Sequence, residues 1–256
     1  MTTERKSEPD LVRSLYLLWG HHPRPGRSGI TVERIVRAGI DLADQEGIGA
    51  TTMRNVAERL GVSTMALYNH VPGKDDLTAL MIDAVYAELY AEDDPRAAGD
   101  WRAGLRVIAE LTWDLYARHP WLLDVQDTRI GLGPHAARKY ETEIRVLDGI
   151  GLSDLDMEAS LTTLLNIVAG AARASRSDVE VQRRSGMADA EWWAIVSPVL
   201  DRLMVDADYP VSGRVGTTVG QTFDAAHSPR YTLDTGVAIL IAGIDRLIED
   251  ASPADG

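Results

Sequence analysis

Apolar residues along this chain recur three or four positions apart, the spacing that gives an α-helix one apolar face. One such set falls three, one, three and one residues apart: Leu77, Leu80, Met81, Ala84 and Val85. No segment shows sustained alternation of apolar and polar residues bounded by turn signals, the pattern that is typical of a β-strand. The pattern therefore predicts an all-α fold.

The first third of the chain is predicted to hold three short helices and then a longer one. Side chains that can accept a hydrogen bond from the first turn of a helix stand at the start of the first three, namely Thr31, Thr51 or Thr52, and Ser63. Gly47 and Gly61 end the first two helices, and Val71-Pro72-Gly73 ends the third, because proline disfavours helical geometry in the residue before it. The fourth helix runs from about Leu77 towards Tyr90.

Only Gly61-Val62-Ser63 separates the second predicted helix from the third, which is the arrangement of a helix-turn-helix. The third helix offers side chains that can meet base edges and phosphates in a DNA major groove: Ser63, Thr64, Met65, Tyr68, Asn69 and His70. We expect Arg54 in the second helix and Lys74 at the start of the fourth to add contacts to DNA. Met65 and Tyr68 are also compatible with a place in the core, and His70 with packing against the first helix.

The rest of the chain is predicted to form helices over about residues 101–118, 134–150, 153–184, 189–205 and 231–249. The last of these has the clearest apolar stripe, and its small residues Ala238, Ala242 and Gly243 would let another helix approach closely. Residues 206–229 are rich in Gly, Pro, Ser and Thr, so we expect them to form a long, partly ordered connection.

Charge is distributed unevenly along the 256 residues, whose net charge is −13. Residues 1–80 hold ten Lys and Arg against ten Asp and Glu, so residues 81–256 carry the whole negative charge. This favours a flexible basic N-terminal arm over 1–29, a helix-turn-helix DNA-binding domain over 30–75, and a larger helical effector-binding and dimerisation domain over 76–250. Arg24 and Arg27 in the arm are candidates to enter a minor groove.

Two stretches of the predicted helix-turn-helix, Thr52 to Ser63 and Ala66 to Leu77, resemble the DNA-binding domain of the TetR family of bacterial transcriptional repressors. The resemblance implies that Tyr68 and Lys74 contact backbone phosphates. Asn69 stands where the tetracycline repressor has an aromatic residue, and the similarity of the body is too loose to carry drug or metal ligands onto any residue here, so tetracycline itself is not assumed as the effector.

The body is similar, more loosely, to the tetracycline-repressor-type C-terminal domain, at Glu191-Trp192-Trp193, at Tyr209-Pro210 and in the last helix. This similarity implies a homodimer held together by the last two long helices, about 153–184 and 231–249. It also implies that the dimer binds a double-stranded DNA operator and that a small-molecule effector weakens this binding.

An effector pocket should be mainly apolar with a few polar groups. The candidates for its lining are aromatic residues and one amide of the body: Trp113, Tyr116, Asn166 and Trp192. Each aromatic residue taken singly is also compatible with ordinary core packing.

Catalytic, metal and cofactor chemistry find no support in the sequence. Cys is absent, which excludes disulfides and Cys-ligated zinc, and the histidines lack the close spacing of a metal site. The glycines from Gly213 to Gly220 lack a preceding strand and a Lys-Ser/Thr pair, so we expect no phosphate-binding loop. We therefore expect no enzyme and no cofactor. Because no apolar stretch is long enough to span a bilayer, we also expect a cytoplasmic protein.

These patterns favour a ligand-responsive, sequence-specific DNA-binding regulator, most simply a repressor of a palindromic operator. The alternative is an α-helical small-molecule-binding protein without sequence-specific DNA binding. Retention on duplex DNA at low salt would distinguish the two hypotheses, because phosphate contacts are strongest there.

Overall fold

The computed structural model describes residues 7–21, 30–90, 93–125, 132–204 and 208–251. Within these ranges every regular element is a helix and no strand occurs, so the predicted all-α fold is confirmed. In chain order the α-helices are α1 (Glu8–Leu18), α2 (Val32–Glu46), α3 (Met53–Leu60), α4 (Thr64–Tyr68), α5 (Lys74–Tyr86), α6 (Trp101–Arg118), α7 (Pro134–Ile144), α8 (Asp154–Ser185), α9 (Asp189–Leu203), α10 (Pro210–Phe223) and α11 (Pro229–Ala251). Short 3-10 helices lie between them at η1 (Ile48–Ala50), η2 (Pro95–Ala98) and η3 (Pro120–Asp124). None of the described helices combines the length and the apolar character that crossing a membrane requires.

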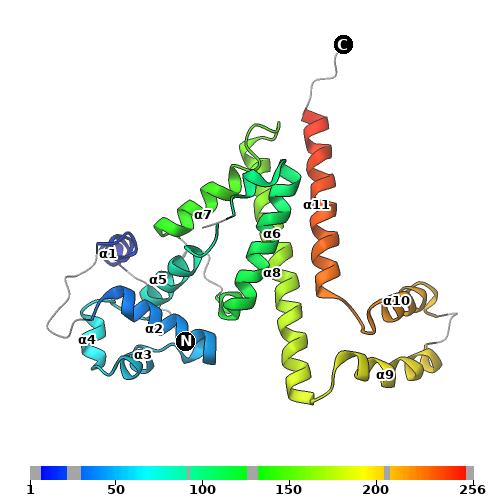
Figure 1. Cartoon of the computed structure of the whole chain (residues 1–256), viewed down its shortest axis with the longest axis horizontal. Helices are drawn as coiled ribbons and strands as arrows, with labels where there is room; N and C mark the ends of the chain where they lie inside the picture. The colour runs from blue at the N-terminus through cyan, green and yellow to red at the C-terminus, as the bar shows by residue number, and fades with distance from the viewer. Residues whose placement is uncertain (1–6, 22–29, 91–92, 126–131, 205–207, 252–256) are drawn as a thin grey trace, which may run out of the picture.

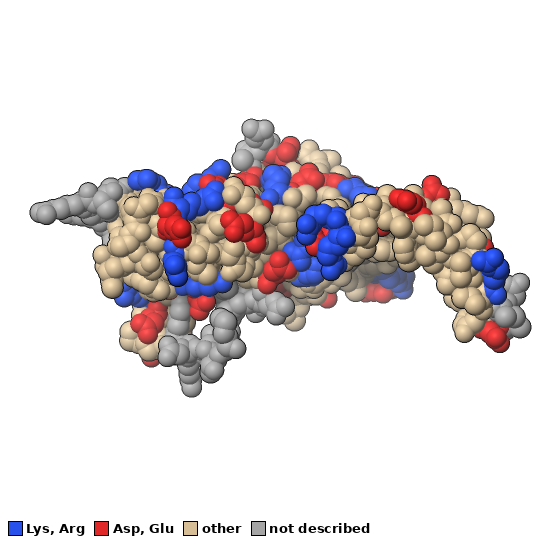
Figure 2. All heavy atoms as spheres, turned by 90° about the horizontal axis from the view of Figure 1, so that it is seen from below, with Lys and Arg blue, Asp and Glu red and all other residues tan. Residues whose placement is uncertain are grey.

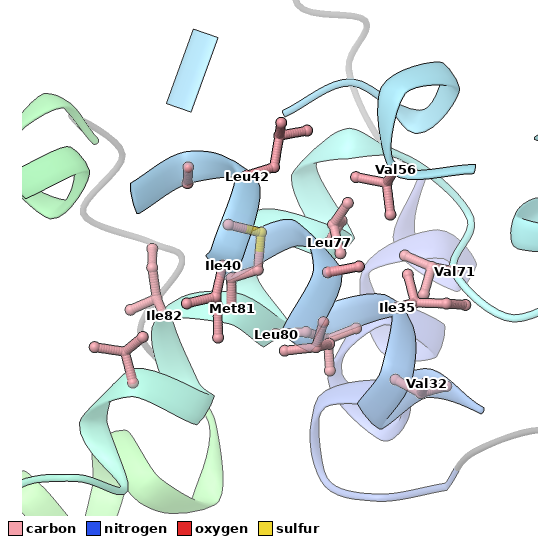
Figure 3. Close-up of a cluster of buried hydrophobic side chains, with 14 of the residues drawn as sticks. Val32, Ile35, Ile40, Leu42, Val56, Val71, Leu77, Leu80, Met81 and Ile82 are labelled. Carbon is pink, nitrogen blue, oxygen red and sulfur yellow. The ribbon is translucent and has the colours of Figure 1, made fainter. Parts of the chain in front are cut away.

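Helices α2, α3 and α4 form the N-terminal head, and α5 completes its core (Figure 3). Ile35, Leu67 and Leu77 have no exposed surface. Burying an aliphatic side chain of this size contributes about 1.5–3 kcal/mol relative to leaving it exposed. Gly39 lets α2 and α5 approach closely, because a Cβ atom there would lie 2.8 Å from Sδ of Met81.

The body is built on α8, which runs alongside both α6 and α11 (Figure 1). Its core holds buried aliphatic side chains from all three helices, among them Leu105, Leu164 and Leu233. Gly236 of α11 faces Ile167 of α8, and a Cβ atom at Gly236 would lie 2.9 Å from Cγ2 of that isoleucine. Helices α9 and α10 extend away from this bundle as a separate pair (Figure 1).

The head and the body meet at α5 and at η3. Trp121 of η3 is 1% exposed, and its indole N–H donates a hydrogen bond of 2.8 Å to Oδ1 of Asp44 in α2. The His119 ring lies between this Asp44 oxygen, 2.7 Å from Nδ1, and Oε2 of Glu88, 3.2 Å from Nε2. From the body side, Arg176 of α8 donates to the last residue of η3. The short helix is thus held by both parts of the molecule.

Asp83 of α5 caps the start of α7. The N-cap residue of α7 is Gly133, which has no side chain to accept the free N–H groups of the first turn. Oδ1 of Asp83 accepts instead from the backbone N–H groups of His135, at 3.0 Å, and Ala136, at 2.9 Å. Burial raises the pKa of the Asp83 carboxyl, and these two donors oppose the rise. A Cβ atom at residue 133 would collide with the carboxylate, so this cap requires glycine.

The expectation of a flexible arm over residues 1–29 is wrong for residues 8–18, which form α1. A capping box between Ser7 and Asp10 starts this helix, and Leu17 and Leu18 at its end are buried in the head core. The apolar cluster from Leu15 to Trp19 is short, and its anchoring role depends on the head core, which residues further along the chain form. Arg24 and Arg27, the minor-groove candidates, lie outside the described residues.

The expectation of a partly ordered connection over residues 206–229 is wrong for residues 210–223, which form α10. Its larger apolar side chains recur every four residues at Val211, Val215, Val219 and Phe223. The glycines and threonines between these positions have low helix propensity, so the composition of the segment favoured a connection over a helix. The helix predicted over 134–150 is shorter than expected, because α7 ends at Ile144.

Candidate functional site

Helices α3 and α4 form the predicted helix-turn-helix. The hydroxyl of Thr52 accepts a hydrogen bond from the N–H of Asn55 at 3.1 Å, and that of Ser63 accepts from the N–H of Ala66 at 3.3 Å, so both helices are capped. Gly61 between them has a φ of +69°, which glycine adopts without strain. Local interactions therefore define the turn and present α4 as a short helix of five residues.

One side of α4 is exposed and carries three of the predicted DNA contacts. Met65 is 69% exposed and Tyr68 is 44% exposed, and Asn69, which follows the helix, is exposed as well. On the other side, Leu67 is fully buried in the head core. The alternative that Met65 and Tyr68 belong to the core is therefore excluded.

Four other predicted contacts come shortly before or after these residues in the chain. Arg54 of α3 and Ser63 are exposed, and Thr64 is half-buried. Lys74 is exposed as the first residue of α5. The N-terminus of a helix carries a partial positive charge, which adds to that of the lysine as an attraction for a phosphate.

His70 does not join the exposed face. It is 7% exposed, and its backbone N–H donates to the carbonyl of Leu67 at 2.8 Å. Its ring nitrogen Nδ1 is buried and has no hydrogen-bond partner among the described residues. Because it is covered, His70 is not available as a surface contact beside Met65 and Tyr68.

Figure 2 shows one face of the molecule, on which Lys and Arg are interspersed with Asp and Glu. The α9–α10 pair at its right carries few charged side chains except near the tip. No single large basic patch is visible on this face. Affinity for a nucleic acid would then depend on a few well-placed cations rather than on a broad basic surface.

The four predicted effector residues are not gathered into one site within this chain. Trp113 and Tyr116 lie one turn apart on α6, and both are half-buried. The guanidinium carbon of Arg230 lies 5.9 Å from the centre of the Trp113 ring. Asn166 is exposed on α8, and Trp192 is 46% exposed on α9. Only Trp113 and Tyr116 remain together as candidates for one pocket.

Sequence reasoning misses a buried polar cluster where α7 packs on α5. The carboxylate of Glu143, 1% exposed, accepts from the hydroxyl of Tyr90 at 2.5 Å and from Nζ of Lys139 at 2.7 Å. Lys139 also lies 5.4 Å from the centre of the Tyr86 ring. Burial and then the Glu143 charge raise the pKa of the Tyr90 hydroxyl, which keeps it protonated as a donor. The only sequence signal is the spacing of Lys139 and Glu143, which is equally common on exposed helix faces.

Hollows adjoin the described body helices, and two of them bear on where a ligand could bind. One, of about 330 Å³, lies over the buried polar cluster and is lined by residues that include Tyr86, Tyr90 and Arg138. The other is an open groove of about 1040 Å³ between α9 and α10. Trp193 lines that groove and packs so closely on Gly220 that a Cβ atom there would lie 2.5 Å from the ring. The tryptophan in the groove is thus the neighbour of the predicted Trp192.

Two protein-family models match the chain. Residues 35–81 match the family described as bacterial regulatory proteins, tetR family. Residues 94–248 match the tetracyclin repressor-like, C-terminal domain. The two matches correspond to the head and to the body.

Individual relatives extend the similarity over most of the chain. The HTH-type transcriptional repressor DrrR1 of Streptomyces coeruleorubidus is 36% identical over 247 residues, which cover 94% of this chain and 90% of the relative. Among solved structures, the transcriptional regulator SCO7222, a TetR from Streptomyces coelicolor, is 27% identical with a TM-score of 0.63, and the match covers 85% of this chain and 99% of that one. ActR of Streptomyces coelicolor, in complex with actinorhodin, is 21% identical and shares the fold with a TM-score of 0.69 over 84% of this chain and 95% of that one.

Proposed function

Because this chain belongs to the tetR family of bacterial regulatory proteins, DNA-binding transcription regulators that are not enzymes, we propose that it represses transcription from an operator of its own. A homodimer binds a palindromic operator, and a small-molecule effector releases it. The observation that carries the proposal is the exposed side of α4, where Met65, Tyr68 and Asn69 lie outside the buried core of the described chain. Such side chains can make apolar and hydrogen-bonding contacts to base edges in a major groove.

Seven of the eight predicted DNA contacts, all except His70, have a proposed part in this recognition. Asn69 and Thr64 read base edges through hydrogen bonds, and Met65 makes apolar contacts, for example to a thymine methyl group. Phosphates are contacted by the remaining polar set: Arg54, Ser63, Tyr68 and Lys74. Phosphate contacts fix the position of the protein on the duplex, whereas base contacts select the sequence.

A second copy of the chain is proposed to cover the exposed sides of α8 and α11. Leu155 of α8 is 82% exposed, and Ile239 of α11 is 68% exposed. Ala242 and Gly243 are exposed as well and give α11 a small surface on which another helix can pack closely. Two copies related by a twofold axis would bury these residues in a bundle of four helices. Asn166, on the exposed side of α8, then belongs to the subunit interface instead of an effector pocket.

The effector is proposed to bind in the body beside Trp113 and Tyr116, whose half-buried rings offer an apolar wall. Trp192 can join them only if α9 of one copy reaches the body of the other. Since η3 is held by Asp44 of α2 and by Arg176 of α8, a shift of α8 on effector binding displaces the head. An effector that prefers the displaced arrangement weakens operator binding, typically by about 1–3 kcal/mol of coupling free energy.

The test is selection of bound duplexes from a random DNA pool at about physiological salt, followed by sequencing. We expect an enriched palindrome whose half-sites lie about one helical turn, 10 base pairs, or a multiple of it apart. A Tyr68→Ala/Asn69→Ala double variant should lose the enrichment. Arg214→Ala, an exposed change on α10, should keep it.

Two outcomes contradict the proposal. Absence of enrichment, with no retention on DNA even at low salt, would favour a small-molecule-binding protein without DNA recognition. Enrichment that survives in the double variant would show that the exposed side of α4 is not the reading surface.

A further inference from the structure

The imidazole ring of His119 lies at the point where the head joins the body. His119 is the last residue of α6 in the body, as its C-cap, and the residue is 7% exposed. Nδ1 lies 2.7 Å from Oδ1 of Asp44 in α2, and Nε2 lies 3.2 Å from Oε2 of Glu88, two residues after the end of α5. The ring therefore connects the end of α6 to α2 and to the segment that follows α5.

Each carboxylate oxygen that faces the ring also faces a second donor. The indole N–H of Trp121 donates to Oδ1 of Asp44 at 2.8 Å. Nε of Arg118 forms an ion pair with Oε2 of Glu88 at 3.6 Å. Both oxygens are thus acceptors, so each nitrogen of the His119 ring must carry a proton in order to donate to them. The geometry is that of an imidazolium held between two carboxylates.

Other charged side chains around the short helix η3 are engaged elsewhere. Asp124 and Arg176 at its far end pair with each other at 2.6 Å, and Nε of Arg173 donates to the carbonyl oxygen of Leu123 at 3.4 Å. The helix η1, which also packs on η3, has no titratable side chain. Histidine is the side-chain type that ordinarily changes charge between about pH 5 and 8. Among the described residues of this junction, His119 is therefore the one able to respond to pH in this range.

Loss of one proton from the ring breaks one of its two contacts. We expect Nε2 to lose the proton, because the contact of Nδ1 with Asp44 is the shorter of the two. Two acceptors with no proton between them cannot form a hydrogen bond, so Glu88 has to turn away from the neutral ring. Glu88 follows α5, and α5 begins with Lys74 in the proposed DNA surface. Movement of Glu88 therefore frees the far end of the helix that carries this lysine.

We propose that His119 is a proton-dependent switch: the charged ring fastens the head to the body in the arrangement that binds DNA, and the neutral ring releases the head. Operator affinity then falls as pH rises, in addition to any control by an effector. The effect on operator affinity rests on the proposed function, whereas the switch at the junction does not.

The first test requires no DNA and uses the full chain with ¹⁵N-labelled histidine and tryptophan. The His119 ring gives the signal that is missing from His119→Gln, and the Trp121 indole gives the signal that is missing from Trp121→Phe. At about pH 6 both nitrogens of the His119 ring should be protonated, and as pH rises the Trp121 signal should shift together with the ring. A ring without both protons at this pH, or a Trp121 signal that stays constant while the ring loses its proton, would overturn the proposal.

The second test compares operator affinity at about pH 6 and about pH 8 by mobility shift at one salt concentration. Between these values the wild type should lose about three- to tenfold more affinity than His119→Gln, which is the value of one hydrogen bond. Glu88→Gln removes the charge that faces Nε2 and should behave like His119→Gln. The Glu88 side chain is 37% exposed, so this second variant keeps the test valid if His119→Gln does not fold.

His227→Gln is the matched control. The His227 side chain is 56% exposed and pairs with one carboxylate, that of Asp178, within the body, so this variant should keep the pH profile of the wild type. Equal losses of affinity in the wild type, His119→Gln and Glu88→Gln would overturn the proposal. If no operator is bound at either pH while the ring and the indole shift together, the proposed function fails and the switch at the junction is supported.

Discussion

Alanine at residue 133 is expected to destabilise the protein, although it adds only one methyl group. The backbone of Gly133 has φ of −84° and ψ of 172°, a conformation that alanine adopts without strain. The loss of stability comes from the added Cβ atom, which would collide with the carboxylate of Asp83. To relieve the collision, the carboxylate must leave the N–H groups of His135 and Ala136 that it caps.

The expected cost follows from the groups left without partners. Removing a capping side chain from a helix costs about 0.5–2 kcal/mol, and a hydrogen bond to a charged group is worth about 1.5–3 kcal/mol. Asp83 is 6% exposed, so the displaced carboxylate has little access to water as a replacement partner. We therefore expect Gly133→Ala to lower the free energy of unfolding by about 2–3 kcal/mol.

Urea unfolding at one fixed protein concentration measures this cost. Gly49→Ala is the matched control, because Gly49 is exposed and no atom lies within 4 Å of its added Cβ, so its effect should stay within about 0.5 kcal/mol. Asp83→Ala should cost about as much as Gly133→Ala, and the double variant little more, since all three lose the same hydrogen bonds. A Gly133→Ala variant as stable as the wild type, or a double variant that costs the sum of the two, would refute the reasoning.

Three further changes test other parts of the structure. Lys74→Ala should weaken binding to all DNA sequences alike, and the slope of the logarithm of affinity against the logarithm of salt concentration should fall by about one unit per subunit. Arg214→Ala should change neither the affinity nor this slope. Mobility shifts at several salt concentrations measure both quantities. Burial raises the pKa of Asp83 above its ordinary value of 3.8, so protonation of this carboxyl favours the folded state, and that advantage over the ionised form is lost as pH rises through the folded value. Above this range the ionised carboxylate still caps α7, with less net stability than the protonated group. Urea unfolding at pH values from below 3.8 upwards measures the free energy of unfolding of the wild type and of Asp83→Asn. The difference, wild type minus variant, should fall as pH rises, and a rise would contradict the raised pKa of Asp83. Tyr90→Phe should destabilise the protein by about 1–3 kcal/mol in the same assay, because the buried Glu143 loses a hydrogen bond; an unchanged stability would show that this bond is not needed.

The helix-turn-helix was predictable from the sequence because local interactions define it. Thr52 and Ser63 start its helices with their own side chains, and Gly61 supplies the left-handed turn between them. These interactions join residues only a few positions apart. The exposed side of α4 was also predictable, since Leu67 is the apolar residue that anchors the opposite side.

The local sequence pattern did not predict helices α1 and α10. Leu17 and Leu18 stabilise α1 through burial in the head core, formed by residues that lie further along the chain. In α10 the apolar period is interrupted by glycines, which have low helix propensity. Tertiary packing overrode composition in α1, whereas in α10, where Gly220 is the only buried residue, the local period of the apolar side chains is kept despite the glycines.

The helical class, the helix-turn-helix and its caps follow from the sequence, because periodicity and capping depend on neighbouring residues. Which polar groups are buried depends instead on how the helices pack. Packing covered His70, placed Trp193 instead of Trp192 in the groove between α9 and α10, and brought Asp83 to the start of α7, whose N-cap Gly133 lies fifty residues further along the chain. The physical reason is that burial and capping across the fold depend on which helices cross, and crossing depends on contacts between residues far apart in the chain.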